Sequence, residues 1–328
     1  MTITTALAKI GRGPAACEDL TRGEAQELFS ALLSREATPV QLGALLMALR
    51  WKGETPDELS GFAAALSART RRMAAPSRAA RVAVIPSYSP HNYQPNLIPA
   101  LAIRLARAGV PVLVHGGLGG GPQGGERPPS FRVFEELGHV AVTSIAQAEE
   151  TLALKNLAVL PVELLNPDLG ALLELRGEFG SRHVGHQLAR LLDPFPGQSV
   201  RLVCSSDTSM LDRLSDLVAE SAGDALLMRA TDGETYANPE RRPRITWFRR
   251  GEAEVLYDED PYPGHGTPLR EDPTDIEAVA GLIKDMLDGR RPTPLPLASQ
   301  LAACFVATGH AKTLTHARAM VAVGVGVR

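Results

Sequence analysis

Short apolar segments that alternate with helical patterns constrain the fold of this chain more than any other feature. Residues 82–85 are β-branched and apolar, a helical pattern covers residues 96–108, and residues 110–114 form a second apolar segment. Two strands joined by a helix pair in parallel, so this stretch predicts an α/β fold. Ligands of such folds bind at the loops that follow the strands, so we expect function at the loops after residues 85 and 114.

The alternation continues toward the C-terminus. Further strands are predicted at residues 157–161, 200–204, 225–228 and 244–248, with helices between them. This pattern predicts an α/β domain over residues 79–328, with a mostly parallel sheet and helices on both faces. Residues 162–195 have a helical pattern that interrupts the alternation, and we expect them to join the N-terminal helices in space.

Residues 1–78 predict a small N-terminal helical domain. Thr21 and Glu24 form a capping-box pattern at the start of one helix. Thr38 and Thr55 each precede a proline, which favours the first turn of a helix. Apolar residues recur at helical spacing after each of these starts, so the segment predicts several amphipathic helices.

The composition is that of a globular protein without a strong overall charge. Apolar residues make up 44% and charged residues 22% of the 328 residues, and the net charge is −3. A nucleic-acid partner must therefore be held by a local basic surface. No apolar run reaches about 18 residues, so no membrane partner is expected. The 3 cysteines lie outside any CxxC motif and no signal-peptide pattern opens the chain, which predicts a cytoplasmic protein with reduced thiols.

One segment of the helical domain resembles a known family. Residues 41–55 read QLGALLMALRWKGET, and Leu59-Ser60-Gly61 follows them. Both are similar to the N-terminal helical domain of anthranilate phosphoribosyltransferases and nucleoside phosphorylases. The resemblance extends over nearly the whole chain. It implies the fold of these transferases and a homodimer formed through the N-terminal helices.

The loop after the first predicted strand departs from that family. Active members carry a glycine-rich GTGGDG loop, whose backbone N–H groups contact pyrophosphate. This chain has Pro86-Ser87-Tyr88-Ser89-Pro90 there, with no glycine and with two prolines that lack an N–H group. We therefore expect no phosphate cradle of backbone donors. The residues at or near the former phosphate loop are Pro86, Ser87, Tyr88, Ser89, Asn96, His115 and Gly116.

Two further motifs of the family are only partly kept. The KHGNR motif becomes Val114-His115-Gly116-Gly117-Leu118, which keeps the histidine and the first glycine. The GxRT motif of the anthranilate site becomes Gly180-Ser181-Arg182-His183, which keeps the arginine. His115 and Arg182 are therefore the remnants of the catalytic machinery, and neither is assigned a catalytic role.

The metal motif of the family is also altered. The paired Asp-Glu that holds Mg²⁺ becomes Gly233-Glu234, and the nearest aspartate, Asp232, is displaced by one residue. Such a shift points the carboxylate elsewhere, whereas Mg²⁺ needs near-octahedral oxygen ligands. Asp232 and Glu234 are weak metal candidates. No cofactor is expected, and Mg²⁺ only if transferase chemistry remains.

The same departures resemble one branch of the family, the YbiB-type proteins. The shared features are the proline-serine-tyrosine loop, Gly185-His186, the segment from Gly233 to Pro239, and Ala307-Thr308-Gly309. This resemblance implies a homodimer that binds single- or double-stranded nucleic acid without sequence preference. It does not imply the tryptophan-pathway reaction.

Binding to nucleic acid requires cations that neutralise phosphates. Tyr88, Tyr93 and Trp247 are candidates for stacking on bases. A simpler interpretation is that each arginine lies on a solvated helix face or in a turn. The sequence does not show whether the arginines lie close together in space. The candidate arginines are Arg104, Arg107, Arg132, Arg182, Arg190, Arg241 and Arg242, with Arg244, Arg249 and Arg250 beside the last two.

Three functions remain open from the sequence. The chain is a nucleic-acid-binding relative without transferase activity, a phosphoribosyltransferase of altered specificity, or an anthranilate enzyme that uses phosphoribosyl pyrophosphate. His115, His183 and His186 could act as general acids or bases near the former cleft, although isolated histidines are more often structural. The missing phosphate loop favours the first function.

Overall fold

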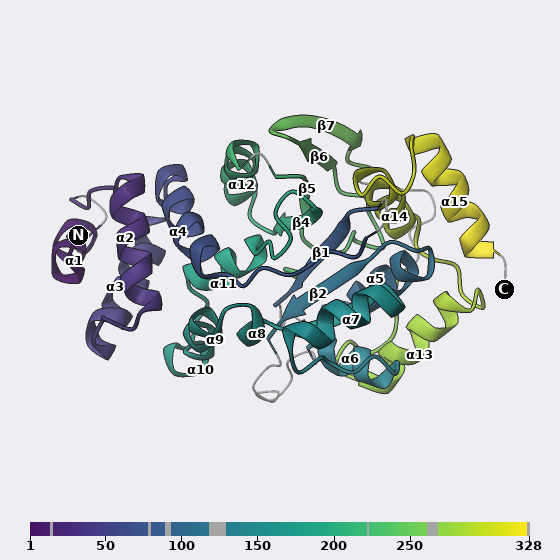
Figure 1. Ribbon diagram of the computed structural model, residues 1–328, viewed down its shortest axis with the longest axis horizontal. Coiled ribbons are helices and arrows are strands. Elements are labelled where there is room, and N and C mark those ends of the chain that lie inside the picture. Colours follow the sequence, from purple (N-terminus) through teal and green to yellow (C-terminus); the bar gives the residue numbers. More distant parts are fainter. Residues whose placement is uncertain are drawn as a thin grey trace. The chain divides into compact units, whose positions relative to one another are not determined.

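The computed structural model describes residues 1–13, 16–77, 80–88, 93–117, 129–221, 223–260 and 268–326. The backbone forms two compact units (Figure 1). The first contains Met1–Arg71 and Leu165–Pro194, and the second contains Arg72–Leu164 and Phe195–Arg328. The helices that interrupt the β/α alternation therefore belong to the same unit as the N-terminal helices.

The first unit is helical throughout its regular structure. Capping boxes begin the helices that were predicted at Thr21, Thr38 and Thr55, and a proline occupies the first turn after Thr38 and after Thr55. The predicted helix starts are thus confirmed. The helices are α1 Ile3–Ile10, α2 Arg22–Leu33, α3 Pro39–Lys52, α4 Pro56–Arg69, α9 Pro167–Glu174, α10 Arg176–Phe179 and α11 Val184–Leu188, followed by a 3-10 turn at Ala189–Leu191; α8, Val162–Leu165, lies at the boundary.

Helices α2 and α4 pack closely because Gly61 lies between them. A Cβ at Gly61 would come within 2.3 Å of the Arg22 carbonyl oxygen and 2.8 Å of Ala25 Cβ. The rings of Phe29 and Phe62 pack beside this contact, with centroids 5.3 Å apart. The glycine recognised in the sequence therefore serves helix packing.

A buried carboxylate, that of Glu58, forms hydrogen bonds with residues that precede α2 and α4. Glu58 is fully buried, and its carboxylate accepts hydrogen bonds from the backbone N–H groups of Leu20 and Thr55, at 2.9 and 2.8 Å. It also accepts a hydrogen bond from Lys52 Nζ at 2.8 Å, and the ammonium group contacts Asp19 at 2.6 Å. The charge of Glu58 is thus fully compensated, which a buried charge requires.

The second unit is built on a seven-stranded sheet with the order β3-β2-β1-β4-β5-β6-β7. Strands β1 to β5 are parallel to one another, whereas β6 and β7 are antiparallel additions at one edge. The mostly parallel sheet is confirmed. Its strands are β1 Val82–Ser87, β2 Val112–Gly116, β3 Leu157–Pro161, β4 Ser199–Ser205, β5 Ala225–Arg229, β6 Ile245–Arg249 and β7 Glu252–Tyr257.

Helices cover both faces of this sheet (Figure 1). Leu202 and Leu226 face a core shared with α5, α13 and α14. Helix α12 packs on β4 and β5, and its buried residues lie outside that core, so it covers the other face. The helices of this unit are α5 Ile98–Arg107, α6 Ser130–Glu136, α7 Ile145–Lys155, α12 Thr208–Glu220, α13 Ile276–Leu287, α14 Leu295–Ala307 and α15 Leu314–Gly326. No helix in the described ranges is long and apolar enough to cross a membrane.

Two details of the sheet differ from the sequence prediction. Pro86 and Ser87 were expected in a loop, but they extend β1 and pair in register with His115 and Gly116 of β2. The ladder between β1 and β4 ends at Val84, so Pro86 interrupts no bond on that side. Strand β7 was missed because its first half is exposed and carries two glutamates, unlike the continuous apolar run of a buried strand.

Glu58→Ala should destabilise the helical unit. The substitution leaves two backbone N–H groups without their acceptor and removes one of the two carboxylates that contact the buried Lys52 ammonium. Breaking a buried ion pair costs about 3–5 kcal/mol. The free energy of unfolding in urea, followed by circular dichroism, measures this loss. Glu18→Ala, which removes an exposed ion pair with Arg12, is the control and should change stability by less than about 1 kcal/mol. An equal loss of unfolding free energy in both variants would contradict the stabilising role of the buried Glu58 carboxylate.

Candidate functional site

The carboxyl ends of β1 and β2 meet at a hydrogen-bonded pair of side chains. The Tyr88 hydroxyl and His115 Nδ1 lie 2.8 Å apart, and the two rings meet edge to face. His115 is fully buried, and burial lowers the pKa of its imidazole to about 3. The ring is therefore neutral at physiological pH. Its Nε2 atom has no hydrogen-bond partner among the described residues.

Gly116 is required by the approach of the two strands. A Cβ at this position would lie 2.2 Å from the Ser87 carbonyl oxygen and 3.0 Å from the Phe131 ring. No other residue fits without moving the backbone of β1. The His115-Gly116 pair that the family resemblance singled out thus has a packing role in this chain.

A tight turn after β5 is connected to the end of β1. Asp232 and Gly233 have positive φ angles of 50° and 77°, which bring Thr231 and Glu234 into an isolated antiparallel bridge. The Asp232 carboxylate accepts a hydrogen bond from the backbone N–H of Gln94 at 2.8 Å. This turn therefore holds the segment that follows the former phosphate loop.

Other contacts fix the same turn and the start of α5. Thr235 Oγ1 donates a hydrogen bond to the Pro86 carbonyl at 3.0 Å. Asn96 is buried, and its Oδ1 accepts a hydrogen bond from the Ile98 N–H at 3.0 Å. Of the residues assigned to the former phosphate loop, Ser89 lies outside the described residues. The others lie at the carboxyl ends of β1 and β2 or just before α5.

The metal candidates are placed where a cation has little access. Glu234 is 1% exposed, and Asp232 is engaged by the Gln94 backbone. Over the residues that the structure describes, no group of three histidine, cysteine, aspartate or glutamate side chains could hold a metal ion. These positions therefore do not fit a magnesium ion shared between carboxylates and a phosphate.

Arg104 and Arg107 lie at the C-terminal end of α5 and contact α13. Arg104 donates a hydrogen bond to the Met286 carbonyl, and Arg107 donates one to the Leu287 carbonyl at 3.2 Å. Both carbonyls end α13, where cations are favourable. Burial, and then the charge of Arg107, lower the pKa of Arg104. Helix α5 begins near the carboxyl end of β1 and runs back along the sheet. Arg104 and Arg107 at its C-terminus therefore lie toward the end of the sheet where the parallel strands begin.

Arg132 and Arg242 of this unit have acidic neighbours. Arg132 is exposed and forms an ion pair with Glu135 at 3.2 Å. Arg242 lies over the Tyr257 ring at 5.2 Å and forms a long ion pair with Asp260 at 3.8 Å. Arg241 is exposed beside it. The structure does not bring these arginines together with Arg104 and Arg107.

Arg182 and Arg190 lie in the helical unit, where they form a cluster with Arg176. Burial, then the charge of His183 and then those of the three arginines lower the pKa of His186 to about 2, so all three arginines act on one imidazole ring. We call Arg176, Arg182 and Arg190 the arginine cluster. Sequence reasoning missed Arg176, although the density of arginines and histidines in residues 176–190 was a signal for it.

His183 has a structural role at the start of α11. Its Nδ1 accepts a hydrogen bond from the Gly185 N–H at 3.2 Å, and its Nε2 donates one to the Leu172 carbonyl at 3.1 Å. Burial lowers the pKa of His183 to about 4. The ring is therefore a neutral helix cap, which supports the structural interpretation of this histidine.

Comparison with known proteins places the fold and the sequence in one family. Residues 4–70 match the family model described as the helical bundle domain of a glycosyl transferase family. The chain is 36% identical over 314 residues to the uncharacterized protein YbiB of Escherichia coli strain K12, an alignment that covers 95% of this chain and 96% of that protein. It is also 31% identical over 211 residues to the anthranilate phosphoribosyltransferase of Natronomonas pharaonis, covering 64% and 61%.

Solved structures show the same fold at lower sequence identity. The anthranilate phosphoribosyltransferase of Thermus thermophilus superposes with a TM-score of 0.73 and 20% identity, over 98% of this chain and 94% of that chain. The Saccharomyces cerevisiae enzyme in complex with PRPP and Mg gives 0.72 and 12%, over 98% and 93%. Because the fold is shared with these transferases and the Escherichia coli relative aligns over almost its whole length, this chain belongs to the anthranilate phosphoribosyltransferase-like family.

Proposed function

We propose that this chain binds nucleic acid without sequence preference and does not carry out the anthranilate reaction. The absence of the anthranilate reaction is inferred from the hydrogen bond between Tyr88 and His115, because these side chains occupy the place where the ends of β1 and β2 meet. Nucleic-acid binding is inferred from the family branch and from the arginine cluster. Separate experiments test the two claims.

The former transferase site lacks the groups that phosphoribosyl pyrophosphate requires. Active relatives bind the pyrophosphate with backbone N–H groups of a glycine-rich loop, whereas Pro86 has no N–H and lies within β1. A neutral His115 supplies no positive charge to a phosphate. The position of Asp232 and the burial of Glu234 do not fit a magnesium ion, so the proposal contains no metal-dependent step.

The arginine cluster supports binding to the phosphate backbone. Three arginines lie near one histidine ring in a protein whose net charge is −3, so positive charge is concentrated locally. Each phosphate neutralised by such a cation releases counterions, which supplies most of the affinity in binding without sequence preference. Nucleic acid needs no base-specific contact in this arrangement. The proposal places the protein in the cytoplasm, and Cys17, Cys204 and Cys304 are free thiols.

An exposed apolar stripe on α3 supports the homodimer. Val40, Met47 and Trp51 are 82%, 38% and 71% exposed, and their spacing of seven and four residues places them on one helix face. A cavity of about 270 Å³ lies beside Met47 and Trp51 and is also lined by Cys17. The proposal pairs this stripe with that of a second copy. Two copies would present two arginine clusters to one strand and so raise its affinity.

Retained phosphoribosyltransferase activity is the competing function, because relatives with that name share the fold and part of the sequence. Incubation of the protein with anthranilate, phosphoribosyl pyrophosphate and Mg²⁺ tests it. We expect no phosphoribosyl anthranilate by fluorescence. Turnover that is lost in His115→Gln would overturn the inactivity part of the proposal.

Binding to single-stranded DNA should depend strongly on salt and on the arginine cluster. Each phosphate contact adds about 0.7 to the slope of log affinity against log salt for a single strand, so removal of three contacts lowers the slope by roughly 2. We expect the variant with Arg176, Arg182 and Arg190 changed to Ala to bind at least about tenfold more weakly at low salt. Fluorescence anisotropy with a labelled oligonucleotide of mixed sequence measures both quantities.

A charge-matched variant controls for the loss of net charge. Arg12, Arg270 and Arg290 are exposed, and Arg12 and Arg290 form surface ion pairs. Their replacement by Ala removes the same three charges and should leave the affinity close to that of the wild type. Equal losses in both triple variants would remove the cluster from the proposal, and no binding by the wild type at low salt would refute nucleic-acid binding.

Trp51→Glu should convert the dimer to a monomer. A charge in the middle of the apolar stripe must be desolvated without a partner, which an interface core does not tolerate. Light scattering after size-exclusion chromatography gives the mass, to be compared with twice and once 35.0 kDa. Leu154→Glu is the control, because Leu154 is equally exposed, at 73%, but lies on α7. A monomeric wild type, or a dimeric Trp51→Glu variant, would contradict the interface.

A buried, neutral His115 predicts how stability depends on pH. The folded state holds the pKa near 3, whereas the unfolded chain takes up a proton below its ordinary value of 6.5. The unfolded state therefore binds more protons between these values, and stability falls as the pH drops from 6.5 toward 3. His115→Gln should reduce the loss of unfolding free energy between pH 7 and pH 5 by about 2 kcal/mol.

Tyr88→Phe is the matched variant for this measurement. It removes the hydrogen bond but keeps the buried histidine, so the pH dependence should remain. Urea unfolding at the two pH values, followed by near-ultraviolet circular dichroism, measures it. An unchanged pH dependence in His115→Gln would show that the ring titrates normally in the folded protein.

A further inference from the structure

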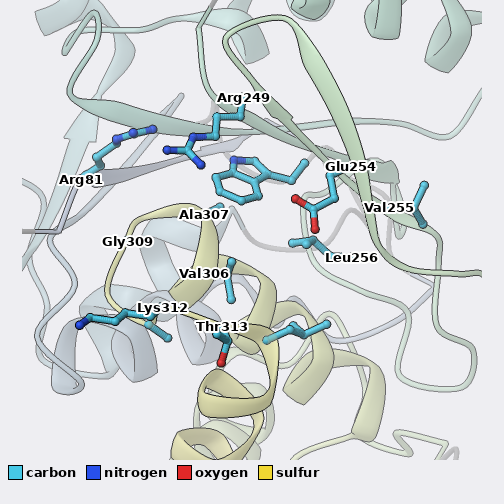
Figure 2. Close-up of a pocket in the computed structure, with 13 residues that line it drawn as sticks. Arg81, Arg249, Glu254, Val255, Leu256, Val306, Ala307, Gly309, Lys312 and Thr313 are labelled. Carbon is cyan, nitrogen blue, oxygen red and sulfur yellow. The ribbon is translucent and has the colours of Figure 1, made fainter.

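A second cleft lies at the β6–β7 edge of the sheet, away from the former transferase site. It has a volume of about 640 Å³ and is formed by β6, β7, the end of α14 and the start of α15 (Figure 2). Pockets for small molecules have volumes of roughly 300–1,000 Å³. Arg81, which precedes β1, completes the lining. The cleft is therefore large enough for a metabolite and belongs entirely to the second unit.

Two guanidinium groups face one another at one end of this cleft. Figure 2 shows Arg81 and Arg249 with their side-chain nitrogens turned toward each other. Burial, and then the charges of Arg249 and Arg250, lower the pKa of Arg81. Arg81 is ion-paired with Asp224, but Arg249 has no carboxylate within 4.0 Å in the part of the chain that the structure describes. An anion between the two groups would relieve their repulsion.

Further donors line the cleft. The guanidinium of Arg249 lies over the Trp247 ring, 5.5 Å from its centroid. Trp247 is 8% exposed, and its indole N–H has no hydrogen-bond partner among the described residues. Lys312 stands before α15, whose first turn is capped by Thr313 Oγ1. Cations, an unpartnered N–H group and a helix start all favour a ligand rich in acceptors.

The rest of the lining is mostly apolar. Val306 and Ala307 of α14 and Leu256 of β7 form one wall, which suits an aromatic ring or a hydrocarbon body. Glu254 is the one carboxylate of the lining, and Glu252 lies opposite Arg249 in the β6–β7 ladder. Figure 2 shows the Glu254 carboxylate on the side away from Arg81. The cleft is thus polarised, with its positive end at Arg81 and Arg249.

The Ala307-Thr308-Gly309 motif positions the positive end. The Thr308 carbonyl accepts a hydrogen bond from the Arg81 N–H at 2.8 Å, and Thr308 Oγ1 donates one to the Cys304 carbonyl at 2.7 Å. Gly309 has a φ of 79°, which lets the chain turn from α14 into the cleft wall. The former transferase site gives this motif no role, whereas the cleft does.

We propose that this cleft binds a nucleotide unit, with the phosphoryl group held between Arg81 and Arg249 and the base against Val306 and Ala307. Trp247 donates a further hydrogen bond to the phosphoryl oxygens. The nucleotide is either free or part of a nucleic-acid strand. The site is distinct from the arginine cluster, so it does not depend on the proposed function.

The indole N–H signals give a direct test. The chain has 2 tryptophans, so the ¹⁵N-labelled protein shows two indole signals, which Trp51→Phe assigns. Titration with AMP should move the Trp247 signal with a Kd below about 1 mM, which is modest for a pocket of this size. The Trp51 signal should stay in place. Adenosine, which lacks the phosphoryl group, should bind at least tenfold more weakly.

Paired variants and a second probe locate the phosphoryl group and its source. Arg249→Gln and Arg81→Gln should each weaken AMP binding about tenfold, whereas the exposed controls Arg290→Gln and Arg270→Gln should not. A Trp247 shift with an octathymidylate strand, but not with AMP, would assign the phosphoryl group to nucleic acid. No Trp247 shift with either probe, or a shift that both cleft variants retain at full affinity, would overturn the proposal. AMP binding without DNA binding would refute the proposed function alone.

Discussion

The parallel pairing of β1 with β2 is the constraint on which the rest of the second unit depends. Its register places Gly116 against the Ser87 carbonyl so closely that a side chain cannot fit there. The same register carries His115 into the core, where burial keeps its imidazole neutral. The Tyr88 hydroxyl, which follows β1, forms a hydrogen bond with that ring. The pairing therefore determines both the fold and the chemistry that its carboxyl edge can support.

The fold is shared with anthranilate phosphoribosyltransferases, whereas the groups at the strand ends contact one another within this chain. Packing maintains the strands and helices shared with anthranilate phosphoribosyltransferases, because apolar side chains can fill a core whatever the loops contain. The strand ends are different, since Pro86, Tyr88 and Asp232 make contacts within the protein. Positive charge is concentrated elsewhere, in the arginine cluster and at Arg81 and Arg249. Both locations are consistent with phosphate ligands held by side chains rather than by a backbone loop.

Much of the fold followed from local patterns. Thr21, Thr38 and Thr55 marked helix starts because a capping side chain lies within three residues of the amide that it satisfies. Buried parallel strands are apolar on both faces, so β1 to β5 were recognisable. Strand β7 was not, because an edge strand tolerates polar residues where it faces solvent. The cleft at Arg81 and Arg249 joins residues far apart in the chain, and no local spacing indicates it.

Residue type and short-range spacing were enough to predict the α/β architecture and the helical domain, and residues 86–90 contain no glycine. The roles of the other side chains depend on which residues meet in three dimensions. It placed Arg104 and Arg107 at the end of α13, and it made His183 a helix cap. It also gathered Arg176, Arg182 and Arg190 around one histidine. The physical reason is that charge interactions depend on distance in space, whereas a sequence gives distance only along the chain.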